Sequence, residues 1–436
     1  MPETFRAPIG TQDVLPPESA RWQALVTTFA GVAERFGYGL VHGPLFEDLA
    51  VFQRLGAGTD VVRKEMYDFR DKGDRHLALR PEATASVARA FVQHRPPTPW
   101  KVWCVTPAFR YERPQAGRLR QHHQLDVEVL GAADPDVDVE IISLGATYLA
   151  ALGLRRWRLV LNTMGTPADR EVYAATLTAW LRERAPDLPA EDRDKVESHP
   201  LRVLDSKRPA TQALVADAPR MVDVLDARSR AHFERVRAGL TALGIPFEVD
   251  TRLVRGIDYY THTLFEFQGD ALETAQSTLI GGGRYDGLVE QLGGPPTPGI
   301  GFGSGIERML LACDAEGVLP VPDSTLDVFV VDATDGAAAR DLVHQLRLAG
   351  LRADRAFDGR SLKSQMKAAG RSGARVAVII RDREVADGTA IVRDLAQSEQ
   401  EVVPRDTVAD RVRKLIETPV PADGDPPPPA PTAEAE

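Results

Sequence analysis

Residues 121–130 form the segment that most constrains the fold. Polar and apolar side chains alternate along it with a period of two, which is typical of a β-strand that buries one face. Gln124, Asp126 and Glu128 share the polar face. A second strand is predicted over residues 102–110, so the two form a hairpin with an arginine-rich loop. Guanidinium groups match phosphate oxygens, so the hairpin suits a ligand with both a positive charge and a phosphate. The alternative is a half-exposed hairpin with a solvated charged face.

The rest of the chain divides into several predicted domains, as expected for 436 residues. Before the hairpin, we predict a helix over 20–36, a strand over 39–46 and a helix over 81–92 with Pro81 in its first turn. After it come a helix over 137–152 and a strand over 158–162. Residues 165–244 have helical spacing and few strand signals, which predicts a helical insertion.

The C-terminal part returns to strand signals. They occur at 247–249, at 264–267 and in the glycine-rich stretch 280–305, which precedes a helix over 306–313. A Pro- and Gly-containing linker is predicted over 317–324. Beyond it, a strand over 327–331, helices over 337–349 and 361–369 and a strand over 376–381 predict a small α/β domain with a partly parallel sheet.

Composition excludes several classes of protein. The chain has no long apolar run and no basic-then-apolar leader, so neither a membrane span nor a signal peptide is expected. Two cysteines are too few for a disulfide framework or a zinc site, and the chain is expected to be cytoplasmic. The net charge is −10, but residues 417–436 contribute five acidic and no basic residues. This proline-rich tail is expected to be disordered, and a local basic patch elsewhere remains compatible with nucleic acid.

Three further clusters carry candidate chemistry. Glu82 and Thr84 open a predicted helix, where the carboxylate is either functional or an ordinary first-turn charge. Arg255 and Gly256 precede Tyr259 and Tyr260, an arrangement in which an arginine and two phenols can approach a ligand. Glycines are frequent over residues 281–305, where their lack of side chains leaves room for a flat ligand such as adenine.

Other catalytic signatures are missing from the sequence. The glycine-rich stretch has no Gly-Lys-Ser/Thr, and its third glycine is out of register for a dinucleotide fingerprint. His122 and His123 are adjacent on a strand and face opposite sides, so they cannot share a metal. There is no Gly-x-Ser-x-Gly elbow for a nucleophilic serine.

Together these clusters resemble the bacterial histidyl-tRNA synthetases, which are class II aminoacyl-tRNA synthetases. Residues 43–46 resemble the dimer-forming motif 1, residues 109–114 with the returning strand resemble motif 2, and residues 301–308 resemble motif 3. Residues 253–260 and 282–288 are similar to segments particular to the histidine enzyme. The resemblance covers residues 6–416.

The resemblance implies an α/β (α+β) fold with an antiparallel class II catalytic sheet, a helical insertion and a C-terminal α/β anticodon-binding domain. The implied boundaries are 1–165 and 246–320 for the catalytic domain, 166–245 for the insertion, 326–416 for the anticodon-binding domain and 417–436 for the tail. The implied reaction joins histidine to ATP, giving histidyl-adenylate and pyrophosphate, and then transfers histidine to the 3′ end of tRNA(His). ATP, Mg²⁺, L-histidine and tRNA(His) are the implied ligands, and a homodimer is expected.

The resemblance also implies roles for individual residues. Arg255 and Arg110 would be catalytic. The histidine-binding residues would be Glu82, Ala83, Thr84, Gln124, Glu128, Arg255, Tyr259, Tyr260 and Tyr285. ATP would be bound by Arg110, Arg118, His122 and Arg308. The tRNA would be contacted by Arg113, Gln115 and Arg118. No metal site made by the protein alone is expected.

Within these roles, Glu128 and Tyr260 would bind the two imidazole nitrogens. Arg255 would bridge the histidine carboxylate and the α-phosphate as charge accumulates there. The sequence departs from the family at two positions: His122 stands where phenylalanine often stacks on adenine, and His262 replaces a frequent arginine.

The alternative is a non-catalytic, histidyl-synthetase-like regulatory subunit of histidine biosynthesis. Such relatives typically lack the anticodon-binding domain and erode the Arg255 segment, and both are present in this sequence. A plain RNA-binding module would have no reason to keep Glu128 opposite Tyr260.

Overall fold

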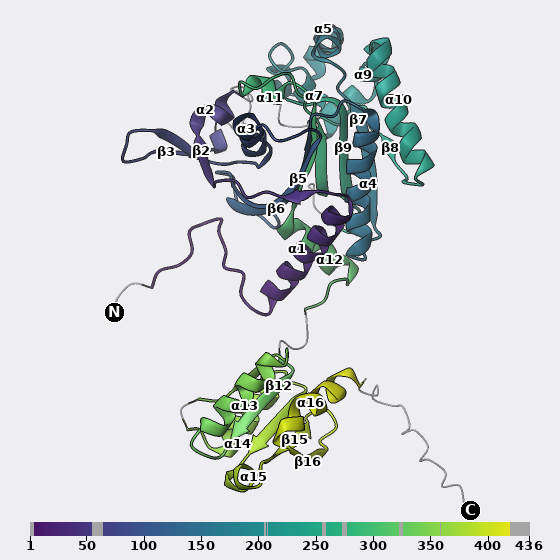
Figure 1. Cartoon of the computed structure of the whole chain (residues 1–436). Helices are drawn as coiled ribbons and strands as arrows, with labels where there is room; N and C mark the ends of the chain where they lie inside the picture. Colours follow the sequence, from purple (N-terminus) through teal and green to yellow (C-terminus); the bar gives the residue numbers. More distant parts are fainter. Residues whose placement is uncertain are drawn as a thin grey trace, which may run out of the picture. The chain divides into compact units, whose positions relative to one another are not determined.

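The structure, a computed structural model, describes residues 4–54, 64–204, 206, 208–254, 259–272, 277–321, 326–357 and 359–418. The chain divides into two compact units, Met1–Val321 and Pro322–Glu436 (Figure 1). Arg255, Gly256 and the tail beyond Thr418 lie outside the described residues.

The first unit is built on an eight-stranded sheet with the order β1-β5-β6-β11-β10-β9-β7-β8. Only its outer pairs, β1 with β5 and β7 with β8, are parallel. The strands are β1 (Gly39–Leu40), β5 (Trp100–Phe109), β6 (Gln121–Leu130), β7 (Trp157–Thr163), β8 (Glu248–Val249), β9 (Thr261–Gly269), β10 (Thr278–Arg284) and β11 (Gly299–Gly305). The mainly antiparallel sheet that the resemblance implies is therefore confirmed.

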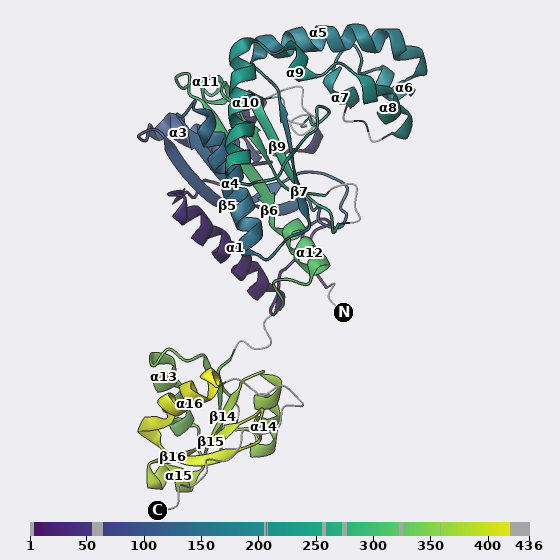
Figure 2. The ribbon, with the colours of Figure 1, turned by 90° about the vertical axis from the view of Figure 1, so that its right-hand side faces the viewer.

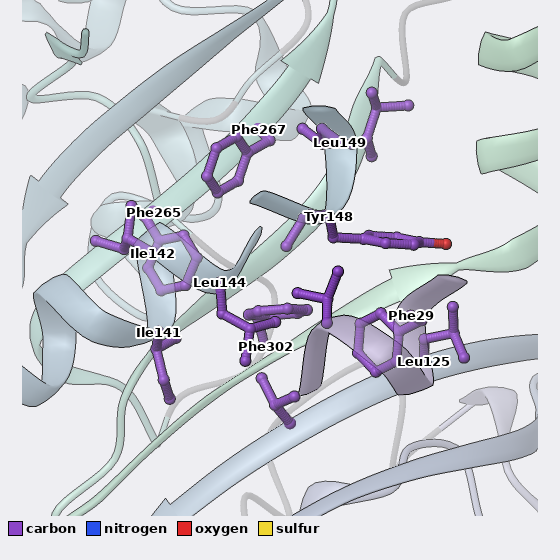
Figure 3. Packing of buried hydrophobic residues seen from close by; sticks show 14 of the residues in the cluster. Phe29, Leu125, Ile141, Ile142, Leu144, Tyr148, Leu149, Phe265, Phe267 and Phe302 are labelled. Carbon is purple, nitrogen blue, oxygen red and sulfur yellow. The ribbon is translucent and has the colours of Figure 1, made fainter. Parts of the chain in front are cut away.

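A layer of helices covers the apolar face of this sheet. The helices are α1 (Glu18–Arg35), α4 (Pro135–Ala151), α10 (Ala227–Ala242) and α12 (Ile306–Glu316). Helix α4 begins where Asp134 caps the backbone N–H of Asp136 and Pro135 occupies the first turn. The aromatic rings of Phe29 and Tyr148 meet edge to face at 4.9 Å, among side chains from the sheet such as Leu125 and Phe302 (Figure 3). This packing fixes which face of β6 is apolar and which is left for the polar row.

A small sheet in the order β2-β4-β3 lies next to the start of α3. Its strands are β2 (Phe46–Asp48), β3 (Tyr67–Arg70) and β4 (His76–Leu79), and nearby are helices α2 (Leu49–Gln53), α3 (Thr84–His94) and α11 (Leu288–Gln291). The prediction of one strand over 39–46 is wrong, because the chain breaks at Gly43-Pro44 and its two halves join different sheets.

Residues between β7 and β8 are helical, as predicted. They comprise α5 (Pro167–Arg184), α6 (Ala190–Arg193), α7 (Leu201–Leu204), α8 (Pro209–Leu214), α9 (Met221–Val224) and α10, with short 3₁₀ turns at Ala185–Asp187 and Val215–Asp217. Figure 2 shows the long helix α5 running along the shorter helices. A capping box between Thr166 and Asp169 starts α5, and Tyr173, Leu177 and Leu181 bury its inner face.

The second unit has a five-stranded sheet in the order β13-β12-β14-β15-β16. β12 pairs in parallel with β13 and β14, whereas β15 and β16 continue antiparallel, so the predicted partly parallel sheet is confirmed. The elements are β12 (Val328–Asp332), α13 (Ala337–Leu348), β13 (Ala353–Arg355), α14 (Leu362–Arg371), β14 (Val376–Ile380), α15 (Asp382–Asp387), β15 (Thr389–Asp394), β16 (Gln400–Pro404), a 3₁₀ turn (Arg405–Thr407) and α16 (Val408–Glu417). Glu417, expected to begin the tail, is instead the last residue of α16.

Candidate active site

The polar row of β6 is buried rather than solvated. Asp126 is 3% exposed and Glu128 is 1% exposed, so the alternative of a solvated charged face is wrong. Neighbouring β11 contributes glycines at the opposing positions, with Gly301 paired to Glu128 and Gly303 paired to Asp126. A polar row enclosed in this way is costly unless it meets a complementary ligand.

The glycines of β10 and β11 are required by the side chains that lie over them. A Cβ at Gly301 would overlap Glu128 Oε2 and the carbonyl oxygen of Val127. A Cβ at Gly303 would lie 2.5 Å from Gln124 Nε2, and one at Gly283 would lie 2.8 Å from the Tyr260 ring. The glycine-rich stretch therefore makes room for the polar side chains of neighbouring strands.

Glu128 is held by two hydroxyl groups. Thr84 Oγ1 donates to Glu128 Oε1 at 2.5 Å, and the Tyr285 hydroxyl donates to Oε2. Burial raises the pKa of Glu128 well above its usual range, although both hydroxyl groups act in the opposite direction. The carboxylate is thus prepared for a ligand that brings N–H donors or a positive charge.

Glu82 occupies the turn before α3. Its Oε1 accepts the backbone N–H of Ala85 at 3.2 Å, and its Oε2 accepts the Tyr259 hydroxyl at 2.7 Å. Burial also raises the pKa of Glu82. The predicted helix start at Pro81 is wrong: α3 begins at Thr84, because Glu82 caps the helix from outside and the Pro81 carbonyl accepts Arg110 Nε at 3.0 Å. Ala83, fully buried, lies at the helix cap.

Three tyrosines close this pocket. The ring centroids of Tyr259 and Tyr260 are 4.9 Å apart, and those of Tyr259 and Tyr285 are 5.7 Å apart. All three side chains are buried in one hydrophobic cluster. The structure therefore brings Glu128 and Tyr260 to the same pocket, each beside Tyr285.

The pocket gathers three acidic side chains whose ionisation burial makes costly. Burial, followed by repulsion from Glu82, raises the pKa of Asp126 to about 8. Among the described residues, Gln124 Oε1 is buried with no partner at full hydrogen-bond geometry, although the side chain lies close enough to His122 to raise the pKa of that ring against the effect of burial. Three buried carboxylates and an open acceptor favour a small ligand with a cationic group and additional N–H donors.

A cavity of about 1200 Å³ is lined by Gln124 of β6 and Gly303 of β11, the strands that also carry Glu128 and Gly301. Cationic side chains from the hairpin and from α12 line it, together with the imidazole of His122. These residues are Arg110, Arg118, His122 and Arg308. Arg118 forms an ion pair with Glu112, and Arg308 Nη1 donates to the carbonyl of Thr278 at 2.8 Å. The cavity suits an anionic ligand with a flat ring, such as a nucleoside triphosphate.

We expect the His122 ring to act in its neutral form. Burial and the nearby Arg110 cation lower the pKa of His122 to about 3, so the ring stays neutral as the pH rises above that value. For ATP, the nucleotide that the resemblance implies, replacing His122 with phenylalanine should therefore change the KM by no more than about threefold, because both neutral rings can stack on its base. Steady-state kinetics between pH 5.5 and 8.5 checks this. If the pH profile of the wild-type KM showed an inflection near pH 6.5 that the phenylalanine variant lacked, the expectation of a neutral ring would be contradicted.

The tip of the hairpin is exposed. Arg113 and Gln115 face solvent, and the backbones of Gln115 and Arg118 bridge the loop. Arg120 lies with its guanidinium 4.0 Å from the Tyr111 ring centroid. Among the described residues, no group of three or more histidine, cysteine or acidic side chains could hold a metal.

Several residues near the site were not anticipated from the sequence. Lys195, Arg202 and Arg208 of the insertion line the same cavity. Nothing in the local sequence of the insertion marks these three as neighbours of the hairpin. His262 stacks on His232 of α10 with ring centroids 4.8 Å apart, and burial lowers the pKa of His262.

Within the described part of the chain, helices all fall short of the length and apolarity that crossing a membrane requires.

The chain matches known proteins over most of its length. A family model described as histidyl-tRNA synthetase matches residues 10–309, and one described as anticodon binding domain matches residues 320–415. The histidine–tRNA ligase of Rhodococcus erythropolis is 47% identical over 420 residues, covering 95% of this chain and 99% of the relative. That of Geobacillus kaustophilus is 47% identical over 423 residues, covering 94% and 99%. The crystal structure of apo S. aureus histidyl-tRNA synthetase matches with a TM-score of 0.79 and 35% identity, covering 94% of this chain and all of that one.

Proposed function

Because the chain belongs to the histidyl-tRNA synthetase family, we propose that the buried pocket on β6 binds histidine and that the adjoining cavity binds ATP. The chain is a ligase that uses ATP to join histidine to tRNA. The observation that carries the proposal for the site is the position of Glu128. It lies buried between Thr84 and Tyr285, on the same strand as Gln124, which lines a cavity that also holds Arg110 and Arg308.

In the proposed histidine site, Glu128 and Tyr260 take the two imidazole nitrogens, with Tyr259 and Tyr285 enclosing the ring. Glu82, Thr84 and Gln124 hold the α-ammonium group, and Ala83 forms the wall beside them. The open Gln124 Oε1 and the raised pKa of Glu82 support this role, since both groups gain from a positively charged partner.

In the proposed ATP site, Arg110 binds the α-phosphate, Arg308 binds the γ-phosphate and Arg118 adds positive charge. His122 stacks on adenine. The reaction is an in-line attack of the histidine carboxylate on the α-phosphorus, which releases pyrophosphate. Such a reaction is catalysed by positioning and by electrostatic stabilisation of the developing charge. Arg255, which lies outside the described residues, is proposed to bridge the carboxylate and the α-phosphate.

We also propose that Mg²⁺ accompanies ATP. This ion is usually bound by one or two carboxylates together with substrate phosphates, and it needs no cage made by the protein alone. Glu266 is a buried carboxylate in the lining of the cavity, so the residues present fit that requirement. The metal would neutralise charge on the ATP triphosphate, while Arg110 and Arg308 would orient it.

The tRNA is proposed to meet the enzyme at two places. Arg113, Gln115 and Arg118 would contact its acceptor end, with the insertion (166–245) beside them. The unit formed by 326–416 would read the anticodon, where unpaired bases are accessible. Lys363, Lys367 and Arg371 of α14 group positive charge on this unit, whereas Arg375, which follows α14, forms an ion pair with Asp394 at 2.7 Å.

A homodimer is proposed from an apolar surface near motif 1. Its large side chains are unusually exposed for their type, and Phe46 and Phe69 contact each other edge to face. The residues are Leu40, Leu45, Phe46 and Phe69. A second copy of the chain would bury them. The cytoplasm, where tRNA is charged, is the proposed location.

The test is histidine-dependent exchange of pyrophosphate into ATP, followed by transfer of histidine to tRNA(His). We expect Arg255→Ala to lower kcat about 100-fold while changing the KM for histidine little, as for loss of a group that stabilises the transition state. Equal losses in kcat and in histidine affinity would assign Arg255 to binding. A wild-type chain that exchanges pyrophosphate without histidine, or not at all, would overturn the proposed function.

A further inference from the structure

The first residues of β6 extend beyond their partner strand. β6 pairs with β5 from Gln121 onward, but its pairing with β11 begins only at Gln124, opposite Gly305. Beyond Gly305 the chain turns into α12. The backbone N–H of His123 therefore has no strand partner on that side, and a buried N–H without an acceptor is costly.

Glu307, in the first turn of α12, takes the place of the missing strand. Its Oε1 and Oε2 each lie 3.1 Å from the backbone nitrogen of His123, and its Oε1 lies 2.9 Å from His123 Nδ1. The Glu307 side chain is only 9% exposed. On another side, the His123 ring meets Trp22 of α1 edge to face at 4.7 Å. The carboxylate is thus fixed by three contacts with one residue of motif 2.

This contact joins two walls of the cavity. His122 and Arg308 both line the cavity, and each is the immediate neighbour in sequence of one partner in the contact. Because residues alternate along a strand, His122 faces the cavity while His123 faces away from it, toward Trp22. We propose that Glu307 is a positioning residue that holds the strand carrying His122 at a fixed distance from Arg308. Resting on the proposed ATP site, this assigns Glu307 to the spacing between the adenine and γ-phosphate subsites.

The competing role for a carboxylate in this cavity is metal binding. In the structure both oxygens of Glu307 are already within hydrogen-bond distance of His123, so its geometry favours the positioning role. The two roles differ in what glutamine can do. An amide oxygen still accepts the His123 N–H, whereas an amide is a poor replacement for a carboxylate that binds Mg²⁺.

The test compares Glu307→Ala and Glu307→Gln with the control Glu316→Ala in the full-length chain. Glu316 lies at the other end of α12, where its carboxylate accepts the backbone N–H groups of Arg155 at 2.9 Å and Arg156 at 3.2 Å. The control therefore removes a similar contact from the same helix, away from the cavity. Equilibrium ATP binding without histidine, KM values in pyrophosphate exchange, Mg²⁺ titrations and thermal midpoints are measured for each protein.

We expect Glu307→Ala to weaken ATP binding about tenfold or more, with the KM for histidine unchanged within about twofold, as for loss of hydrogen bonds to a charged group. Glu307→Gln should recover most of the affinity, and Glu316→Ala should bind ATP like the wild type.

Three results would overturn the inference. They are unchanged ATP binding in Glu307→Ala, equal weakening in Glu316→Ala, and a glutamine variant as impaired as alanine with a shifted Mg²⁺ requirement. If the wild-type chain itself failed to bind ATP, the proposed function would fail instead.

Discussion

Replacing Glu128 with glutamine is expected to lower kcat/KM for histidine about 1000-fold, because bound histidine then lacks a buried, charged hydrogen-bond partner on the protein. The side chain keeps its size, and the amide can still hydrogen-bond with the hydroxyls of Thr84 and Tyr285. The loss should therefore appear in histidine recognition, with the KM for ATP nearly unchanged. Pyrophosphate exchange with each substrate varied in turn measures both effects.

The same substitution should make the ligand-free protein more stable. Among the described residues, the groups that act most on buried Glu128 are hydroxyls and other carboxyls rather than cations, and its folded-state pKa is raised above the unfolded value. Between these two pKa values the folded state binds more protons than the unfolded state, so wild-type stability falls as the pH rises. The glutamine variant lacks this penalty and should gain at least about 1 kcal/mol at neutral pH. The gain should vanish near pH 4, where the carboxyl is protonated in both states.

Glu384→Gln provides a matched control in the second unit. Glu384 is also buried, but its carboxylate accepts the backbone N–H of Arg381 at 3.1 Å. Removing its charge is therefore not expected to increase the stability of the folded protein. This variant should lose stability slightly and keep the wild-type KM for histidine. Equal histidine kinetics in Glu128→Gln and the wild type would remove Glu128 from the proposed site.

The sequence was most informative where local periodicity and function coincide. The alternation in residues 121–130 identified the polar face of β6 and the apolar face that packs on α1 and α4. Period two is a local property, so it can be read without knowing the partners of the strand. Helical spacing likewise revealed the insertion and most of the helices on the sheet.

Features that depend on contacts distant in sequence could not be predicted in this way. Tyr285 reaches Glu128 only because β10, β11 and β6 are neighbours in the sheet, and Glu307 reaches His123 only because β11 ends at Gly305. The true start of α3 depends on Arg110, which takes the Pro81 carbonyl from another strand. In the second unit, β13 has three residues and β16 is an edge strand with few buried positions, so both give weak periodicity.

Replacing Gly301 with alanine is expected to lower kcat/KM for histidine at least as much as Glu128→Gln does, by roughly 1000-fold or more. The added Cβ would overlap both Glu128 Oε2 and the carbonyl oxygen of Val127 on the paired strand. The carboxylate can move aside, but the backbone of β6 is fixed between β5 and β11, and such overpacking typically costs about 1–3 kcal/mol of stability. The variant should therefore lose both histidine recognition and thermal stability.

Two further variants separate these causes. Gly31→Ala adds the same methyl group in helix α1, where nothing lies within 4 Å, and should be neutral or stabilising. Glu128→Ala in the Gly301→Ala background removes one of the two overlaps, so the pair should be less destabilised than the sum of the single changes in chemical denaturation. The stability that the double variant still lacks, relative to Glu128→Ala alone, measures the overlap with the Val127 carbonyl. Strict additivity, or wild-type histidine kinetics in Gly301→Ala, would show that β11 is not packed against Glu128 in the functional enzyme.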